Sequence, residues 1–209
     1  MEMNRRTLLL GGIASTLAGC ANPNPPMPAQ VDAFKGIYKS NAGSVPSDAQ
    51  VTLLQPVGLI TSENVERYIG AVRDTNEYWA QRVPASLTNT VAMADNDPMY
   101  FAGKLLAMLR GHFPSIAKVH DFRDAVAKGK KGVVLVDMIL KPGEPYGDRT
   151  TRVDIDAYFF DAKMDPASRL RGHGETHVPY ASMDGRIQQS IDAALAQLDG
   201  KIRATVRKR

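Results

Sequence analysis

Three segments between residues 132 and 178 carry the clearest strand pattern in the chain. The run GVVLVDMIL, at 132–140, is apolar at nearly every position, which predicts a strand covered on both faces in the middle of a sheet. The runs RTTRVDIDAYFF (149–160) and SRLRGHGETHV (168–178) alternate between apolar and polar residues, so each is expected to bury one face. Together the three runs predict a β-meander.

A loop at 162–165 between the second and third runs sets the register of their pairing. The predicted cross-strand pairs are Arg152 with Glu175, Asp154 with His173, and Asp156 with Arg171. Each pair joins complementary side chains, so all three favour this antiparallel register.

Helical spacing is strongest near the C-terminus, after Asp184. The apolar stripe there consists of Ile187, Ile191, Leu195, Leu198, Ile202 and Val206. It predicts a long amphipathic helix. A second helix is expected after Asp97-Pro98, with Phe101, Leu105, Met108 and Leu109 on one face, and shorter helices at 62–73 and 122–128. Two further strands are expected, at 49–56 and 115–119.

This order of elements predicts an α/β (α+β) fold with a single domain over residues 48–209. We expect a mixed sheet of about five strands that includes the three-stranded meander, with helices packed on it and the long amphipathic helix at the C-terminal end. Residues 57–96 are interpreted as an insertion in this domain. The proline-rich stretch before it, within 20–47, is interpreted as a tether.

The first 19 residues have the pattern of an export signal. Arg5 and Arg6 precede a short apolar run, 8–17, that ends in small residues. This run is too short for a stable membrane-spanning helix. Leu17, Ala18, Gly19 and Cys20 resemble the lipobox of bacterial lipoproteins, and residues 4–8 resemble a weak twin-arginine signal, which is compatible with Sec or Tat export.

The lipobox resemblance implies that Cys20 carries a diacylglycerol, that cleavage occurs just before it, and that the new amino group is acylated as well. Two or more chains anchor a protein stably where one does not. Ala21 stands where an aspartate would signal retention in the inner membrane, so the resemblance favours the periplasmic leaflet of the outer membrane.

Composition narrows the remaining classes of function. Cys20 is the single cysteine, so the domain contains no disulfide and its stability must come from packing. The net charge of +4 is small, and removal of residues 1–19 changes it little. This mild basicity does not indicate nucleic-acid binding. Two basic clusters, at 128–131 and 201–209, are interpreted as solvated charges, with an anionic lipid or acidic protein partner as the alternative.

The sequence offers few candidate metal-binding or catalytic residues. His173, Glu175 and His177 share one face of a predicted strand and could bind a metal, although we favour a solvated face with cross-strand ion pairs. Asp137 interrupts the apolar strand and needs partners if it is buried, unless an edge position or a bulge accounts for it. His112 and His120 are expected to cap or pack. We find neither a nucleophile elbow nor a glycine-rich phosphate loop, so we expect no enzyme activity and no cofactor.

Residues 48–206 resemble the small domain shared by the TolB amino-terminal region, CsgG-type lipoproteins, LpoB activators of peptidoglycan synthases and some transporter-associated lipoproteins. The resemblance is carried by VTLLQP, FPSIAKVHDFRDAV, GVVLVDMIL and VDIDAYFFDAKMDPASRLRGHGE. It implies a lipid-anchored accessory or assembly factor that binds an envelope protein of the transport or peptidoglycan machinery. The alternatives are a metal- or small-ligand-binding protein that uses His173, Glu175 and His177, and a homo-oligomer formed through sheet edges. The chain lacks the long alternating hairpins of a membrane pore.

Overall fold

A mixed five-stranded sheet forms the centre of the domain, in the order β3-β2-β4-β5-β6. The computed structural model describes residues 28–81, 97–143, 147–177 and 187–208. The strands are β2 (Val57–Thr61), β3 (Ala117–Lys118), β4 (Gly132–Lys141), β5 (Thr150–Phe160) and β6 (Pro166–His177). β2 pairs in parallel with β3 and β4, whereas β4, β5 and β6 pair antiparallel and form the predicted meander. The expected fold class is confirmed.

The predicted register between β5 and β6 is confirmed at all three positions. Arg152 lies opposite Glu175, Asp154 opposite His173, and Asp156 opposite Arg171. β4 is buried along nearly its whole length, as expected of a central strand.

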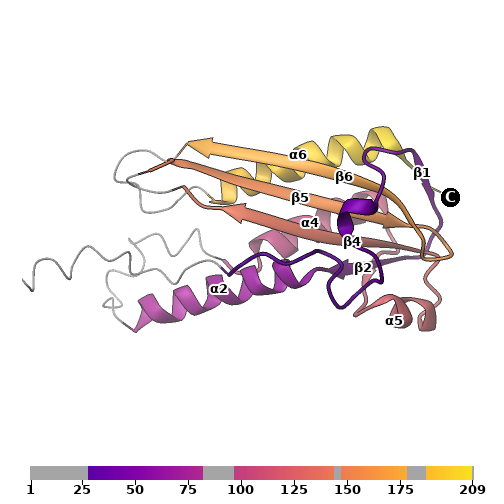
Figure 1. Cartoon of the computed structure of the whole chain (residues 1–209), viewed down its shortest axis with the longest axis horizontal. Helices are drawn as coiled ribbons and strands as arrows, with labels where there is room; N and C mark the ends of the chain where they lie inside the picture. The colour runs from indigo at the N-terminus through magenta and orange to yellow at the C-terminus, as the bar shows by residue number, and fades with distance from the viewer. Residues whose placement is uncertain (1–27, 82–96, 144–146, 178–186, 209) are drawn as a thin grey trace, which may run out of the picture.

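Three helices cover one face of the sheet, namely α2 (Glu63–Ala80), α4 (Tyr100–His112) and α6 (Ile187–Thr205) (Figure 1). Their apolar sides form one core cluster with residues from β4, β5 and β6, including Val136, Ile155 and Leu170. The predicted stripe lies in or against this core along its whole length, and α6 carries it as far as Ile202. The next stripe residue, Val206, belongs instead to the short strand β7 (Val206–Lys208).

α6 approaches β6 so closely that two glycines of the strand contact the helix backbone. A Cβ atom on Gly172 would lie 2.1 Å from the carbonyl oxygen of Ala194, and one on Gly174 would lie 1.9 Å from that of Ser190. The alternation of glycine with polar residues in β6 therefore marks the place where α6 packs on the strand.

The opposite face of the sheet is covered by residues 28–48, which we call the arm, and by α5 (Phe122–Ala127). Phe34 of the arm is 1 % exposed, and its ring packs against Tyr158 and Phe160 of β5 at centroid distances of 4.9 and 5.6 Å. The prediction of a free tether over 20–47 is therefore wrong for its described part. Burial of apolar arm residues holds this segment on the sheet, although their spacing shows no helix or strand period.

The assignment of residues 57–96 to an insertion also differs from the structure. Residues 57–61 form β2, which lies between β3 and β4, and α2 contributes Val65 and Tyr68 to the main core. Residues 82–96 lie outside the described residues. The expected strand at 49–56 is present as β1 (Val51–Leu53), but it pairs in parallel with β7 in a separate two-stranded sheet.

The short helix expected at 122–128 is confirmed as α5. Asp121 caps it by accepting a hydrogen bond from the N–H of Asp124 at 2.8 Å, and the chain leaves it through Gly129 at φ +65°. None of the described helices is both long and apolar enough to cross a membrane.

Candidate functional site

Two carboxylates lie side by side on the arm-covered face of the sheet. Asp137 of β4 and Asp156 of β5 are direct partners in the antiparallel register, and they are 3 % and 2 % exposed. Adjacent buried like charges are costly unless each is compensated. The two side chains are compensated in different ways.

Asp156 is held by two arginines of β6. Its carboxylate accepts hydrogen bonds from Nε and Nη2 of Arg169, at 3.0 and 2.8 Å, and from the same two atoms of Arg171, both at 2.8 Å. Burial alone would raise the pKa of Asp156, but the bonds from Arg171 and Arg169 outweigh it and lower the pKa. Asp156 is therefore the ionised centre of this cluster.

Asp137 has neutral partners instead. Its Oδ1 accepts hydrogen bonds from Ser62 Oγ at 2.5 Å and from Asn64 Nδ2 at 2.9 Å. Burial is the main reason that its pKa is raised, and the nearby Asp156 raises it further. The position is neither an edge nor a bulge, so those two explanations for a carboxylate here are wrong.

Asn64 connects Asp137 to the arm. Its side-chain amide donates to the carbonyl of Val31 at 2.8 Å and accepts from the N–H of Val31 at 2.9 Å, as a neighbouring backbone would. Asp137 thus orients the Asn64 side chain, which holds the arm through two hydrogen bonds to Val31. Sequence reasoning missed this role because Ser62 and Asn64 lie at the start of a helix, where such residues usually act as caps.

His173, Glu175 and His177 each contact a different neighbouring side chain, and His173 Nε2 also lies 3.8 Å from Glu175 Oε2. His173 Nδ1 lies 2.8 Å from Asp154 Oδ1, Glu175 accepts from Arg152 Nε at 3.2 Å, and His177 Nε2 lies 3.4 Å from Arg149. These contacts match the favoured interpretation of a solvated face with cross-strand pairs. Among the described residues, no group of three or more histidine, cysteine or acidic side chains is placed to hold a metal.

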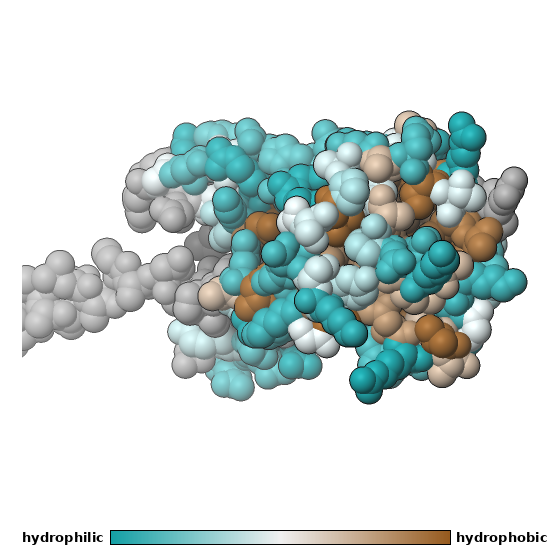
Figure 2. Space-filling model, turned by 45° about the vertical axis from the view of Figure 1, so that its right-hand side comes forward, coloured by the Kyte–Doolittle hydropathy of each residue, from teal (hydrophilic) through white to brown (hydrophobic). Residues whose placement is uncertain are grey.

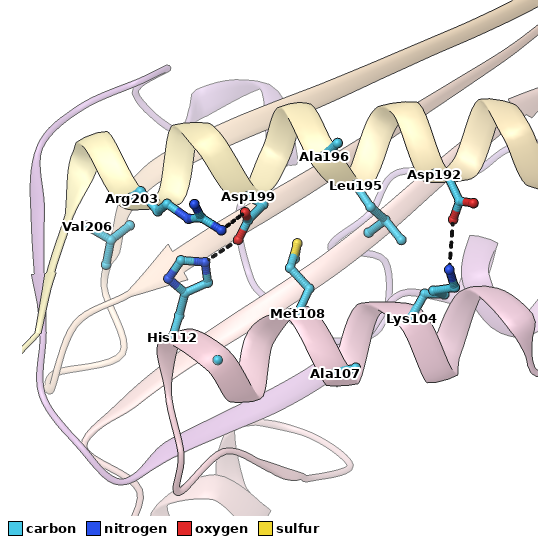
Figure 3. A pocket seen from close by; sticks show the side chains of 11 residues that line it. Lys104, Ala107, Met108, His112, Asp192, Leu195, Ala196, Asp199, Arg203 and Val206 are labelled. Atoms are coloured by element: carbon cyan, nitrogen blue, oxygen red, sulfur yellow. Dashed lines mark hydrogen bonds and ion pairs between the residues drawn. The ribbon is translucent and has the colours of Figure 1, made fainter.

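An open groove of about 760 Å³ runs between α4 and α6. Lys104 and Asp192 pair across it at 3.5 Å, and His112 Nε2 lies 2.6 Å from Asp199, which also binds Arg203 (Figure 3). The His112 side chain is 7 % exposed. It therefore packs at the end of α4, as predicted. The described residues that line the groove include no hydroxyl or thiol nucleophile.

The basic clusters are partly neutralised. Lys128 pairs with Asp124 at 2.9 Å, and Lys201 with Asp48 at 3.4 Å.

In the view of Figure 2, apolar residues form small, separate patches among polar ones. Leu17, Ala18, Gly19 and Cys20 lie outside the described residues.

The buried carboxyl of Asp137 leads to a pH-dependent prediction. Because its folded pKa is raised, the favourable contribution of this group is complete below the unfolded pKa and is lost as the pH rises through the folded pKa. Asp137→Asn keeps an oxygen for Ser62 and Asn64 and removes the charge. We expect the stability of the variant relative to wild type to increase from pH 4 to pH 7, as measured by urea unfolding at several pH values.

Asp74→Asn is the control for this measurement, because that side chain is 65 % exposed and its replacement is expected to change stability by less than ~0.5 kcal/mol. A relative stability of Asp137→Asn that falls as the pH rises would contradict the assignment.

Solved structures similar to this chain include two of PelC from Paraburkholderia phytofirmans. One, a dodecamer of a single-substitution variant, has 12 % sequence identity and a TM-score of 0.32, and the match covers 74 % of this chain and 94 % of that chain. The other, also a dodecamer, has 9 % identity and a TM-score of 0.36, with 79 % and 95 % covered. No family model and no curated protein matches the chain. At this level of similarity, the PelC structures do not bear on the function of the chain.

Proposed function

We propose that the chain is a lipid-anchored protein of the bacterial cell envelope that binds a protein partner without catalysis. The observation that carries the proposal is the sequence Leu17-Ala18-Gly19-Cys20, placed directly after a charged and then an apolar segment. The domain contains no second cysteine, so this thiol is available for a thioether and has no disulfide role within the chain. Ala21 supports the periplasmic leaflet of the outer membrane as the location.

The docked arm supports a short connection to the lipid. Arg67 Nη1 donates to the carbonyl of Ala29 at 2.9 Å, so the chain is held on the domain from this point. The nine Cα–Cα steps from Cys20 to Ala29 can span at most ~30 Å when the chain is extended. The domain therefore stays close to the bilayer, where anchoring raises its effective concentration for an envelope partner.

Cys20→Ser tests the anchor. Expressed with its leader, the wild type is expected to mature to a chain that begins at Cys20, with the added mass of diacylglycerol and an acyl group, and to label with palmitate. The serine variant is expected to lose the label completely and to partition into the aqueous phase of a detergent extraction. Intact-mass analysis and phase partitioning measure both results.

Ala21→Asp is the matched control. It leaves Cys20 and the three residues before it unchanged, so labelling should persist while the protein shifts to the inner membrane fraction. A wild-type chain that retains residues 1–19 and a bare thiol would overturn the proposal.

A further inference from the structure

Among the described residues, the arm covers the outer edge of β6 at one end. The N–H of Arg169 donates to the carbonyl of Pro46, and its carbonyl accepts from the N–H of Asp48, both at 2.8 Å. Asp48 then adopts φ 52°, and the chain turns away to β1. The arm thus forms one isolated parallel bridge at this edge, Ser47 with Arg169, and stops there.

Beyond the arm, β6 continues from Arg171 to His177 as the last strand of the sheet. Because hydrogen bonding alternates along a strand, residues 171, 173, 175 and 177 direct their backbone groups outward, as Arg169 does. The N–H of His173 is met by Gln197 Oε1 at 2.6 Å. Among the described residues, no hydrogen bond to the outward N–H of Glu175 or His177 is found. This edge is seven residues long.

The side chains along the edge complement a second copy of the same strand. In an antiparallel pair centred on Gly174, His173 of each copy lies opposite Glu175 of the other, which forms two favourable pairs by symmetry. His173 and Glu175 are 44 % and 52 % exposed. Each already has surface contacts, His173 with Asp154, Glu175 with Arg152, and the two with each other at 3.8 Å, and a partner strand would share or replace these contacts. Only glycine, without a side chain, lies at the two-fold axis.

Neighbouring registers fit less well. Outward hydrogen bonding allows only shifts that keep odd residues opposite odd residues. A pair centred on residue 175 sets two glutamates opposite each other. A pair centred on residue 173 places His177 of one copy on Arg169 of the other, where the arm already lies.

We propose that the edge of β6 from Arg171 to His177 pairs antiparallel with the same edge of a second copy, so that two domains share one continuous sheet. The interface is small, so in solution it is weak, and confinement of both copies to one leaflet favours it. The pairing goes beyond the proposed function and does not depend on the lipid for its geometry.

A double variant with His173→Cys and Glu175→Cys tests the register. Opposed residues of a hydrogen-bonded antiparallel pair have Cα atoms ~5.5 Å apart, within the range of a disulfide. In cells that express the full chain, we expect at least tenfold more disulfide-linked dimer from the double variant than from either single variant. Mass spectrometry of the linked peptide identifies the 173–175 bond separately from any bond through Cys20, so a failed anchor and a failed pairing are distinguished.

A backbone variant supplies a second test. Glu175→Pro removes an outward N–H that β5 does not use, so the monomer should fold while the dimer is lost. Glu175→Ala keeps the N–H and is the matched control, with a smaller loss of dimer. Gln197→Ala frees the N–H of His173 and should increase the dimer fraction, measured by light scattering of the purified chain.

Folding of every variant is checked by circular dichroism. A folded double variant with no more 173–175 link than the single variants overturns the proposal. So does a disulfide that joins this edge to a different protein, or a dimer fraction unchanged by Glu175→Pro.

Discussion

Gly174→Ala is expected to lower the free energy of unfolding by ~3 kcal/mol or more, because its added Cβ atom makes the closest contact among the described glycines. The new Cβ atom would lie 1.9 Å from the carbonyl oxygen of Ser190 and 2.7 Å from the nitrogen of Ala194. Both are backbone atoms of α6, so no side-chain rotation can relieve the overlap. The helix has to move off β6, which opens the core that Ile191 and Leu198 fill. Guanidinium unfolding measures the loss.

Gly200→Ala is the matched control, because it lies in the same helix and a Cβ atom there meets nothing within 4 Å. It should stabilise the protein by ~0.5–1 kcal/mol, since alanine favours the helix over glycine. Equal effects of the two substitutions would show that α6 does not contact the strand backbone at Gly174.

Asp156→Asn is expected to cost ~3 kcal/mol at neutral pH, because it removes the charge that two arginines share. The estimate lies at the low end for a buried ion pair, since Arg171 is 41 % exposed and water screens part of its charge. The folded pKa of Asp156 is lowered, so the stability it contributes is present above the unfolded pKa and is lost as the pH falls through the folded value. The difference between wild type and variant should therefore shrink in acid.

Urea unfolding between pH 3 and pH 7 measures this difference, and Glu175→Gln is its control. Glu175 pairs with Arg152 at 3.2 Å, but both side chains are well exposed, so the change should be below ~1 kcal/mol. The pH trend is opposite to that expected for Asp137→Asn. If both aspartate variants changed with pH in the same direction, the division into one ionised and one protonation-prone carboxyl would be wrong.

The contrast between these two carboxylates explains how the arm is held. Asp156 is neutralised within the meander by arginines of the neighbouring strand. Asp137 instead acts through Asn64 on the arm at Val31, which lies more than thirty positions before Asn64 in the chain. The first arrangement stabilises the sheet itself. The second connects the sheet to the stretch that leads to Cys20, so that the proposed anchor is joined to the core of the domain.

The candidate site was only partly predictable. The pair of Asp156 with Arg171 followed from the register, but the second arginine and the burial of Asp156 did not, because Arg169 lies diagonally across the strands. The roles of Ser62 and Asn64 carried no signal beyond that of a helix start.

Local periodicity by itself determined the meander, its register and the helices at the C-terminus and after Pro98, and a short local motif predicts the export signal with Cys20. These features repeat every two or three to four residues, or lie in one short motif, so a single pass along the chain detects them. Only the tertiary structure decided that the arm packs on the sheet, that residues 57–61 form an inner strand and that β6 is the last strand of the described sheet. Each of these depends on contacts between distant segments, where Phe34 meets Tyr158 or Asn64 meets Val31, and such contacts leave no period in the sequence.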